Sequence, residues 1–119
     1  MNASALAAKL NLKPGMKLRI VGKPAGVSLP GVSGTASAKA EAVIVFAKTL
    51  AEVDSRAGPA LDAAREDRIA WVAYPKAGKL DTDLNRDILW RHLLGKGIQG
   101  VRQVAPDEVW SAMRFRPKK

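Results

Sequence analysis

Three lysines stand where side chains that bind anions would be expected in a parallel α/β sheet. Lys23, Lys48 and Lys76 each follow closely on a segment with the sequence pattern of a strand. Ligands of open parallel sheets bind beyond the carboxyl ends of the strands, which all lie at one edge. The spacing therefore predicts a lysine rim, formed by these three residues, that would suit a phosphate or another anion. The alternative is that they are ordinary solvated loop lysines.

Two expected helix starts would add to the lysine rim. Thr49 and Thr82 are both good N-cap residues, and each opens a predicted helix on the same side of the sheet. Helix N-termini present free backbone N–H groups and the positive end of the helix dipole. Asn85 and Arg86 lie in the first turn of the second helix, which is predicted to run from Asp83 to about Leu94. Either side chain could face a ligand or bind the preceding loop.

Metal and acid–base chemistry find little support in the sequence. The chain has no cysteine, which excludes disulfides, thiolate catalysis and zinc–sulfur sites. His92 is the only histidine and cannot form a multi-histidine metal site. Asp83 and Asp87 are four residues apart and could share a cation, but helix capping and the i,i+4 pair of Asp87 with Arg91 explain them better. We predict no catalytic residue and no metal site.

Two further motifs were considered for nucleotide or nucleic-acid binding. Gly26 and Gly31 have the spacing of a Walker loop, but Val32-Ser33 stands where Lys-Ser/Thr is required, which argues against a nucleoside triphosphatase. Trp110 and Arg114 share one face of the last predicted strand and could form a stacking platform for bases or an interface patch. Packing of Trp110 beneath a helix is the alternative.

The elements that must position these residues alternate between strand and helix. We predict a helix over residues 4–11, strands at 16–20, 42–46 and 69–74, a helical stretch from 49 to 64 that Gly58-Pro59 kinks or splits, the helix of residues 83–94, and strands at 101–105 and 109–115. This order predicts one α/β domain over residues 1–119, a small three-layer sandwich with parallel central strands and an antiparallel C-terminal hairpin.

Three finer expectations follow from the same patterns. Residues 22–40, rich in Gly, Ser, Ala and Pro, should form a long loop that is either a binding loop or partly disordered, and residues 116–119 should form a solvated basic tail. Apolar residues wrap most of the helix of residues 83–94, so it should be more buried than an average surface helix. Trp71, Trp90 and Trp110 should pack in the core.

The chain resembles an uncharacterised bacterial family, a domain of unknown function, whose fold is related to class I methyltransferases. The residues that carry the resemblance are Leu12–Gly15, Ala42–Phe46, Trp71–Lys76, Thr82–Asp87, Val101–Val104 and Trp110–Phe115. It implies a reduced methyltransferase-like, Rossmann-type sheet with no established activity. It transfers no catalytic residue.

The chain differs from class I methyltransferases in the two features with which they bind their cofactor. A class I methyltransferase binds S-adenosylmethionine on a Gly-x-Gly loop after its first strand and holds the ribose with an acidic residue at the end of its second strand. Here the first strand is followed by Gly22-Lys23-Pro24, and no segment before Ala42 is expected to supply the acid. We therefore expect no cofactor, and S-adenosylmethionine in particular is not expected.

Composition leaves three classes of function open. The formal net charge is +9, no apolar run approaches the ~18 residues of a membrane span, and no signal peptide is evident, so we expect a cytoplasmic protein. The first class is a non-enzymatic binding or interaction domain, monomeric or homodimeric, that takes an anionic ligand or a protein partner at the lysine rim. The second is an enzyme with a nucleotide-like cofactor at the same edge. The third is a nucleic-acid-associated protein, because a basic surface attracts polyanions.

Overall fold

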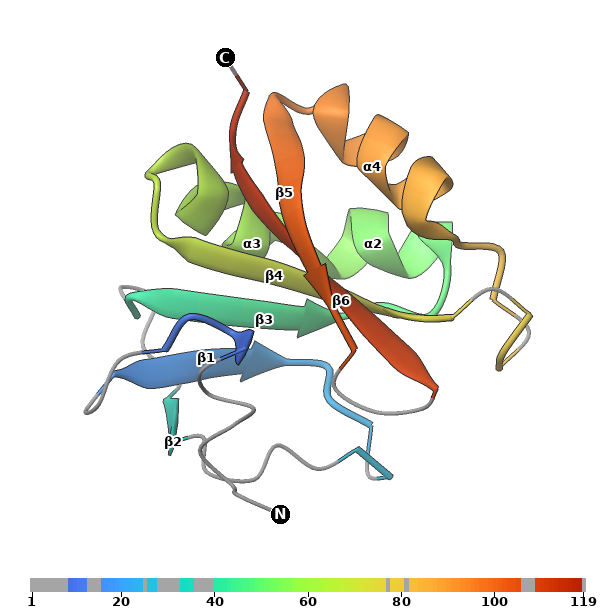
Figure 1. Ribbon diagram of the computed structural model, residues 1–119, viewed down its shortest axis with the longest axis horizontal. Helices are drawn as coiled ribbons and strands as arrows, with labels where there is room; N and C mark the ends of the chain where they lie inside the picture. Colours follow the sequence, from blue (N-terminus) through green and yellow to red (C-terminus); the bar gives the residue numbers. More distant parts are fainter. Residues whose placement is uncertain are drawn as a thin grey trace.

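The fold is known from a computed structural model that describes residues 9–12, 16–24, 26–27, 33–35, 40–76, 78–80, 82–105 and 109–118. Within these residues, six strands form a mixed sheet in the order β2-β1-β3-β4-β6-β5 (Figure 1). The strands are β1 (Lys17–Val21), β2 (Ser33–Thr35), β3 (Ala42–Phe46), β4 (Ile69–Pro75), β5 (Ile98–Val104) and β6 (Trp110–Pro117). The predicted α/β class is confirmed.

The two central strands are apolar on both faces, as parallel strands covered on both sides must be. All five residues of β3 are buried, as are the last six of β4. β1, β3 and β4 are parallel neighbours, with Leu18 opposite Ala42 and Val43 opposite Ala70. The predicted parallel centre of the sheet is therefore confirmed.

The C-terminal strands form the predicted antiparallel hairpin, but the last strand lies inside the sheet. β6 pairs antiparallel with β4 on one side and with β5 on the other, so β5 forms the edge (Figure 1). Because β6 runs against β4, its first residues meet the carboxyl end of β4. Tyr74 lies directly opposite Ser111, and Pro75 opposite Trp110.

Among the described residues, three helices lie over one face of the sheet: α2 (Leu50–Arg56), α3 (Gly58–Arg65) and α4 (Arg86–Leu94). Val53 of α2, Ala64 of α3 and Leu89 of α4 belong to one buried cluster with inward residues of β3, β4 and β6. Pro59 lies in the first turn of α3, where its missing N–H needs no helical partner, so the predicted split of the helical stretch is confirmed. None of the helices in the described ranges is long and apolar enough to cross a membrane.

The opposite face buries a second cluster that includes Trp71, Phe46 and Trp110. The described segment that covers this cluster, residues 9–12, is short. Leu10 is fully buried there, and its carbonyl oxygen accepts a 3.0 Å hydrogen bond from Trp71 Nε1. Most of the helix predicted for residues 4–11 lies outside the described residues.

The segments expected to be irregular at residues 22–40 and 116–119 contain regular structure. β2 pairs in parallel with β1, although Ser-Gly-Thr lacks the alternation of a strand, because main-chain pairing with β1 suffices to form it. Arg116 and Pro117 extend β6, and Arg116 forms two hydrogen bonds to the Asp67 carboxylate, of 3.0 and 3.2 Å. Residues 25, 28–32, 36–39 and 119 lie outside the described ranges.

Helix α4 differs from the prediction in its start and in its burial. It begins at Arg86 with Asn85 as N-cap, not at Asp83 with Thr82. Leu89 and Leu93 are fully buried, whereas Ile88 and Trp90 are 36% and 41% exposed. The helix therefore buries one face only, and Trp90 lies outside the core because that face is centred on the two leucines.

A surface hydrogen bond joins α2 to α4 and makes stability depend on pH. Asp54 Oδ1 lies 2.7 Å from His92 Nε2 and 3.6 Å from Lys96 Nζ. The hydrogen bond from His92 holds the pKa of Asp54 below its ordinary value. A lowered pKa means that the folded state binds the proton less tightly than the unfolded state, so this contribution is present above about pH 4 and is lost at lower pH.

We predict that Asp54→Asn lowers the free energy of unfolding at pH 6 by a small amount, as an exposed pair allows. The difference from the parent should shrink as the pH falls below about 4, where Asp54 in the parent becomes protonated. Urea unfolding of the parent and the variant at pH 6 and at a pH below about 4 would check this. A difference that is the same at both pH values would contradict it.

Candidate functional site

Two adjoining cavities open between the start of α4 and the C-terminal hairpin. The larger, of about 510 Å³, is the tyrosine pocket, lined by Tyr74, Lys76, Asn85, Arg86, Asp87, Gln103, Ala105 and Ser111. The smaller, of about 280 Å³, is the tryptophan pocket, lined by Arg86, Asp87, Trp90, Gly100, Arg102, Gln103 and Met113. The two share Arg86, Asp87 and Gln103, so they adjoin each other, and together they form the groove.

Strand register places Tyr74, which lines the tyrosine pocket, beside Ser111. Tyr74 and Ser111 are directly opposed on β4 and β6, so their side chains lie on the same face of the sheet, beneath α4. Tyr74 is only 2% exposed. Ser111 lies close enough to the Tyr74 hydroxyl for a hydrogen-bond contact that opposes the rise in its pKa, although no hydrogen bond of normal geometry joins the hydroxyl to a residue that the structure describes. Burial raises the pKa of Tyr74, so the hydroxyl keeps its proton at neutral pH and can donate it to an acceptor.

The start of α4 is fixed by a short segment that crosses the N-terminus of α2. Thr82 Oγ1 donates a 2.5 Å hydrogen bond to the carbonyl oxygen of Lys48, and Asp83 Oδ1 accepts a 2.8 Å bond from the N–H of Leu50. Asn85 Oδ1 then caps α4 by accepting from the N–H of Ile88 at 2.9 Å. Each polar residue of this segment therefore satisfies a different backbone group.

The same contacts exclude two of the sequence-based ideas. Asp83 lies before α4 and caps α2, so it does not share a helical face with Asp87 as a metal site would require. The N-terminus of α2 was expected to help bind an external anion, but two of its N–H groups are already used: that of Leu50 by Asp83, and that of Glu52 by the Thr49 hydroxyl at 3.2 Å. Among the described residues, no three potential metal ligands lie together.

The charged groups of the tyrosine pocket are two cations and one acid. The backbone N–H of Lys76 donates to the carbonyl oxygen of Val109 at 2.7 Å, which fixes this residue at the end of β4. Arg86 Nε lies 3.6 Å from Asp87 Oδ1, and both side chains are more than three-fifths exposed. An exposed pair of this length is weak, so Arg86 can turn toward a ligand at little cost.

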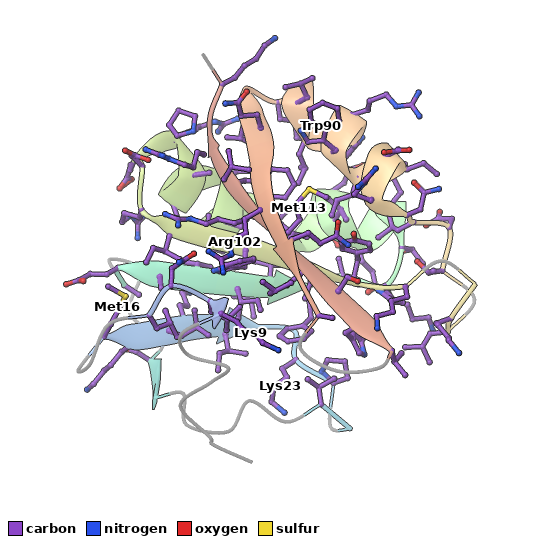
Figure 2. The ribbon with its side chains drawn as sticks, viewed as in Figure 1. Lys9, Met16, Lys23, Trp90, Arg102 and Met113 are labelled. Atoms are coloured by element: carbon purple, nitrogen blue, oxygen red, sulfur yellow. The ribbon has the colours of Figure 1, made fainter. Side chains whose placement is uncertain are left out.

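The structure brings together three of the five residues predicted to bind an anion. Lys76, Asn85 and Arg86 line the tyrosine pocket, whereas Lys23 and Lys48 are not among the described residues that line either pocket. Lys23 Nζ donates to the carbonyl oxygens of Val27 at 2.6 Å and Pro24 at 3.3 Å, so it closes its own turn. Figure 2 shows Lys23 on the far side of the molecule from Trp90 and Met113.

Trp110 and Arg114 do not offer the stacking platform considered from the sequence. Trp110 is 4% exposed and packs edge-on against Phe46, with the ring centroids 5.4 Å apart. Arg114 lies on the face of the sheet opposite α4 and donates to Asn11 Oδ1 at 3.1 Å. Partial burial lowers the pKa of Arg114. Trp110 is therefore a core residue, but it packs on the face of the sheet opposite α2, α3 and α4 and not beneath one of these helices.

The tryptophan pocket depends on a glycine in β5. A Cβ atom at Gly100 would lie 2.6 Å from Met113 Sδ and 2.8 Å from Trp90 Cδ1, so both side chains lean over the strand where it has no side chain of its own (Figure 2). Sequence analysis missed this pocket, as it missed Tyr74 and Ser111. The one local signal was Gly100 itself, since a glycine inside a strand often marks a close approach.

The Tyr74 hydroxyl should add nothing to the stability of the unliganded protein. We predict that Tyr74→Phe leaves the free energy of unfolding unchanged or raises it by up to about 1 kcal/mol, because a buried hydroxyl without a partner is destabilising. Urea unfolding without added ligand measures this. Ser111→Ala, which removes the hydroxyl of the opposing residue and keeps that of Tyr74, serves as the control. A loss of more than 1 kcal/mol in Tyr74→Phe would mean that the hydroxyl is satisfied.

The Asp83 cap should stabilise the fold although it lies outside both helices. Asp83→Ala leaves the N–H of Leu50 without its partner and should cost about 1 kcal/mol, the usual value for a lost cap. Asp83→Asn keeps the accepting oxygen and should cost less. Equal stability of Asp83→Ala and the parent in urea would contradict the assignment.

Comparisons with known proteins add no relative from which a role could be taken. No family model, no curated protein and no solved structure matches the chain. What the protein binds must therefore be inferred from the side chains that line its cavities.

Proposed function

We propose that this protein is a non-enzymatic binding domain whose tyrosine pocket takes a small anion, such as the phosphate group of a metabolite. The observation that carries the proposal is that Lys76, Asn85 and Arg86 line one cavity together with Tyr74, whose buried hydroxyl forms no hydrogen bond of normal geometry with a described residue. Buried polar groups in native proteins are nearly always satisfied. A small displacement of the side chains that cover the hydroxyl would let a ligand oxygen accept a hydrogen bond from it.

The other groups of the pocket suit the same ligand. Lys76 and Arg86 can form charge-assisted hydrogen bonds, which are about twice as strong as neutral ones. Asn85 uses its Oδ1 to cap α4, which leaves its Nδ2 as a donor. The pocket also lies beside the N-terminus of α4, whose dipole favours negative charge. An ammonium, a guanidinium and an amide group thus belong to residues that line one cavity.

We also propose that the sheet is a reduced relative of the methyltransferase sheet. The supporting feature is the antiparallel last strand inserted between β4 and β5, which is how that larger sheet ends. β2 then corresponds to a shortened second strand, and residues 22–40 contain no Asp or Glu that could hold a ribose. On this basis we do not propose S-adenosylmethionine as a cofactor.

A matched pair of double variants tests the proposed anion site. We predict that Lys76→Ala with Arg86→Ala lowers the affinity for pyrophosphate about a hundredfold, since hydrogen bonds to charged groups contribute about 1.5–3 kcal/mol each. Lys23→Ala with Lys48→Ala removes the same charge at the other two positions of the lysine rim and should retain the affinity within about threefold. Isothermal titration calorimetry at constant ionic strength measures both.

Equal losses in the two double variants would contradict the proposal, because binding would then follow net charge and not the pocket. Circular dichroism of each variant would establish that the fold is retained. Parent protein that binds no pyrophosphate, phosphate or sulfate would also contradict it.

A further inference from the structure

The tryptophan pocket adjoins the proposed anion site and differs from it in its lining, which includes an indole ring and a thioether. We infer that the two are occupied by one ligand, a nucleoside 5′-monophosphate, whose base lies against Trp90 while its phosphate enters the tyrosine pocket. This inference rests on the proposed function and assigns a ligand class to the same groove.

The first observation is the exposure of Trp90. Its side chain is 41% exposed although it lies on a helix whose neighbouring Leu89 and Leu93 are fully buried. Its indole ring borders the tryptophan pocket beside the Met113 thioether, and Gly100 keeps the strand between them free of a side chain. An indole face and a polarizable sulfur are good partners for a planar ring. Stacking on an aromatic side chain also accepts any base, because every base has a π-face.

The second observation is the acid at the junction of the two pockets. Asp87 lines both, although a carboxylate would repel a bare anion. A carboxylate accepts hydrogen bonds only, so its place suits the hydroxyls of a ribose or an amino group of a base. A ligand with a negative end, a middle rich in hydroxyl donors and a flat apolar end therefore explains Lys76, Asp87 and Trp90 together.

The third observation is the position of Gln103 and the size of the groove. Gln103 lies opposite Met113 on β6, which places it on the α4 side of the sheet, and it lines both pockets. Its amide can both donate and accept, as the edge of a base requires. The pockets, of about 280 and 510 Å³, provide space for a base at one end and for ribose and phosphate at the other.

The test compares the four nucleoside 5′-monophosphates with inorganic phosphate by calorimetry on the full chain. We expect at least one nucleotide to bind at least ten times more tightly than phosphate. Trp90→Ala should weaken nucleotide binding about tenfold to a hundredfold, as loss of one stacking partner does, and should leave phosphate affinity unchanged. Trp90→Phe should retain most of the nucleotide affinity. Quenching of tryptophan fluorescence on nucleotide binding should disappear in both variants, because Trp71 and Trp110 are buried.

The outcomes separate the two proposals. If phosphate binds and no nucleotide binds better, the tyrosine pocket is an anion site and the ligand class inferred here is wrong. If nucleotides bind but Trp90→Ala weakens phosphate and nucleotide equally, the base does not lie against Trp90 and the inference is again overturned. If neither phosphate nor any nucleotide binds, the proposed function itself fails.

Discussion

The groove depends on one structural feature, the antiparallel pairing of β6 with β4 in the interior of the sheet. This pairing brings the first residues of β6 to the carboxyl end of β4 and sets Tyr74 opposite Ser111. It also moves β5 outward to the edge, where Gly100 and Gln103 form the floor of the groove beneath α4. A one-residue shift of β6 in this register would turn Ser111 and Met113 to the opposite face of the sheet and remove both from the groove.

The second constraint is the segment that carries the chain from β4 into α4. Thr82 and Asp83 bind the backbone at the start of α2, and Asn85 caps α4, so the first turn of α4 is held in a fixed position above the end of β4. Arg86 and Asp87 follow directly and line both pockets. The groove therefore has a rigid frame, with exposed charged side chains that remain free to adjust to a ligand.

Much of the fold could be predicted from local sequence, and the groove could not. The central strand and the broken helix were predicted because the apolar run Ala42–Phe46 and the proline at position 59 each determine the backbone structure at their own positions. The start of α4 was missed because Thr82, Asp83 and Asn85 are all good caps, and only tertiary contacts decide which group each one satisfies. Lys76 was predicted to lie at this edge because it follows a strand, and Asn85 and Arg86 because they lie in the first turn of a helix, and all three line the tyrosine pocket. Tyr74 and Ser111 meet only through the register of two strands, which no local pattern specifies.

The most direct test of the central claim is a nuclear magnetic resonance titration of the ¹⁵N-labelled protein with pyrophosphate. If the tyrosine pocket is the anion site, the largest and saturable shifts should occur at the backbone amides of Tyr74, Lys76, Arg86 and Asp87, which surround the cavity. The amides of Lys23 and Lys48 should change little. Shifts centred on those two lysines, or spread over the basic surface and abolished by salt, would contradict the account.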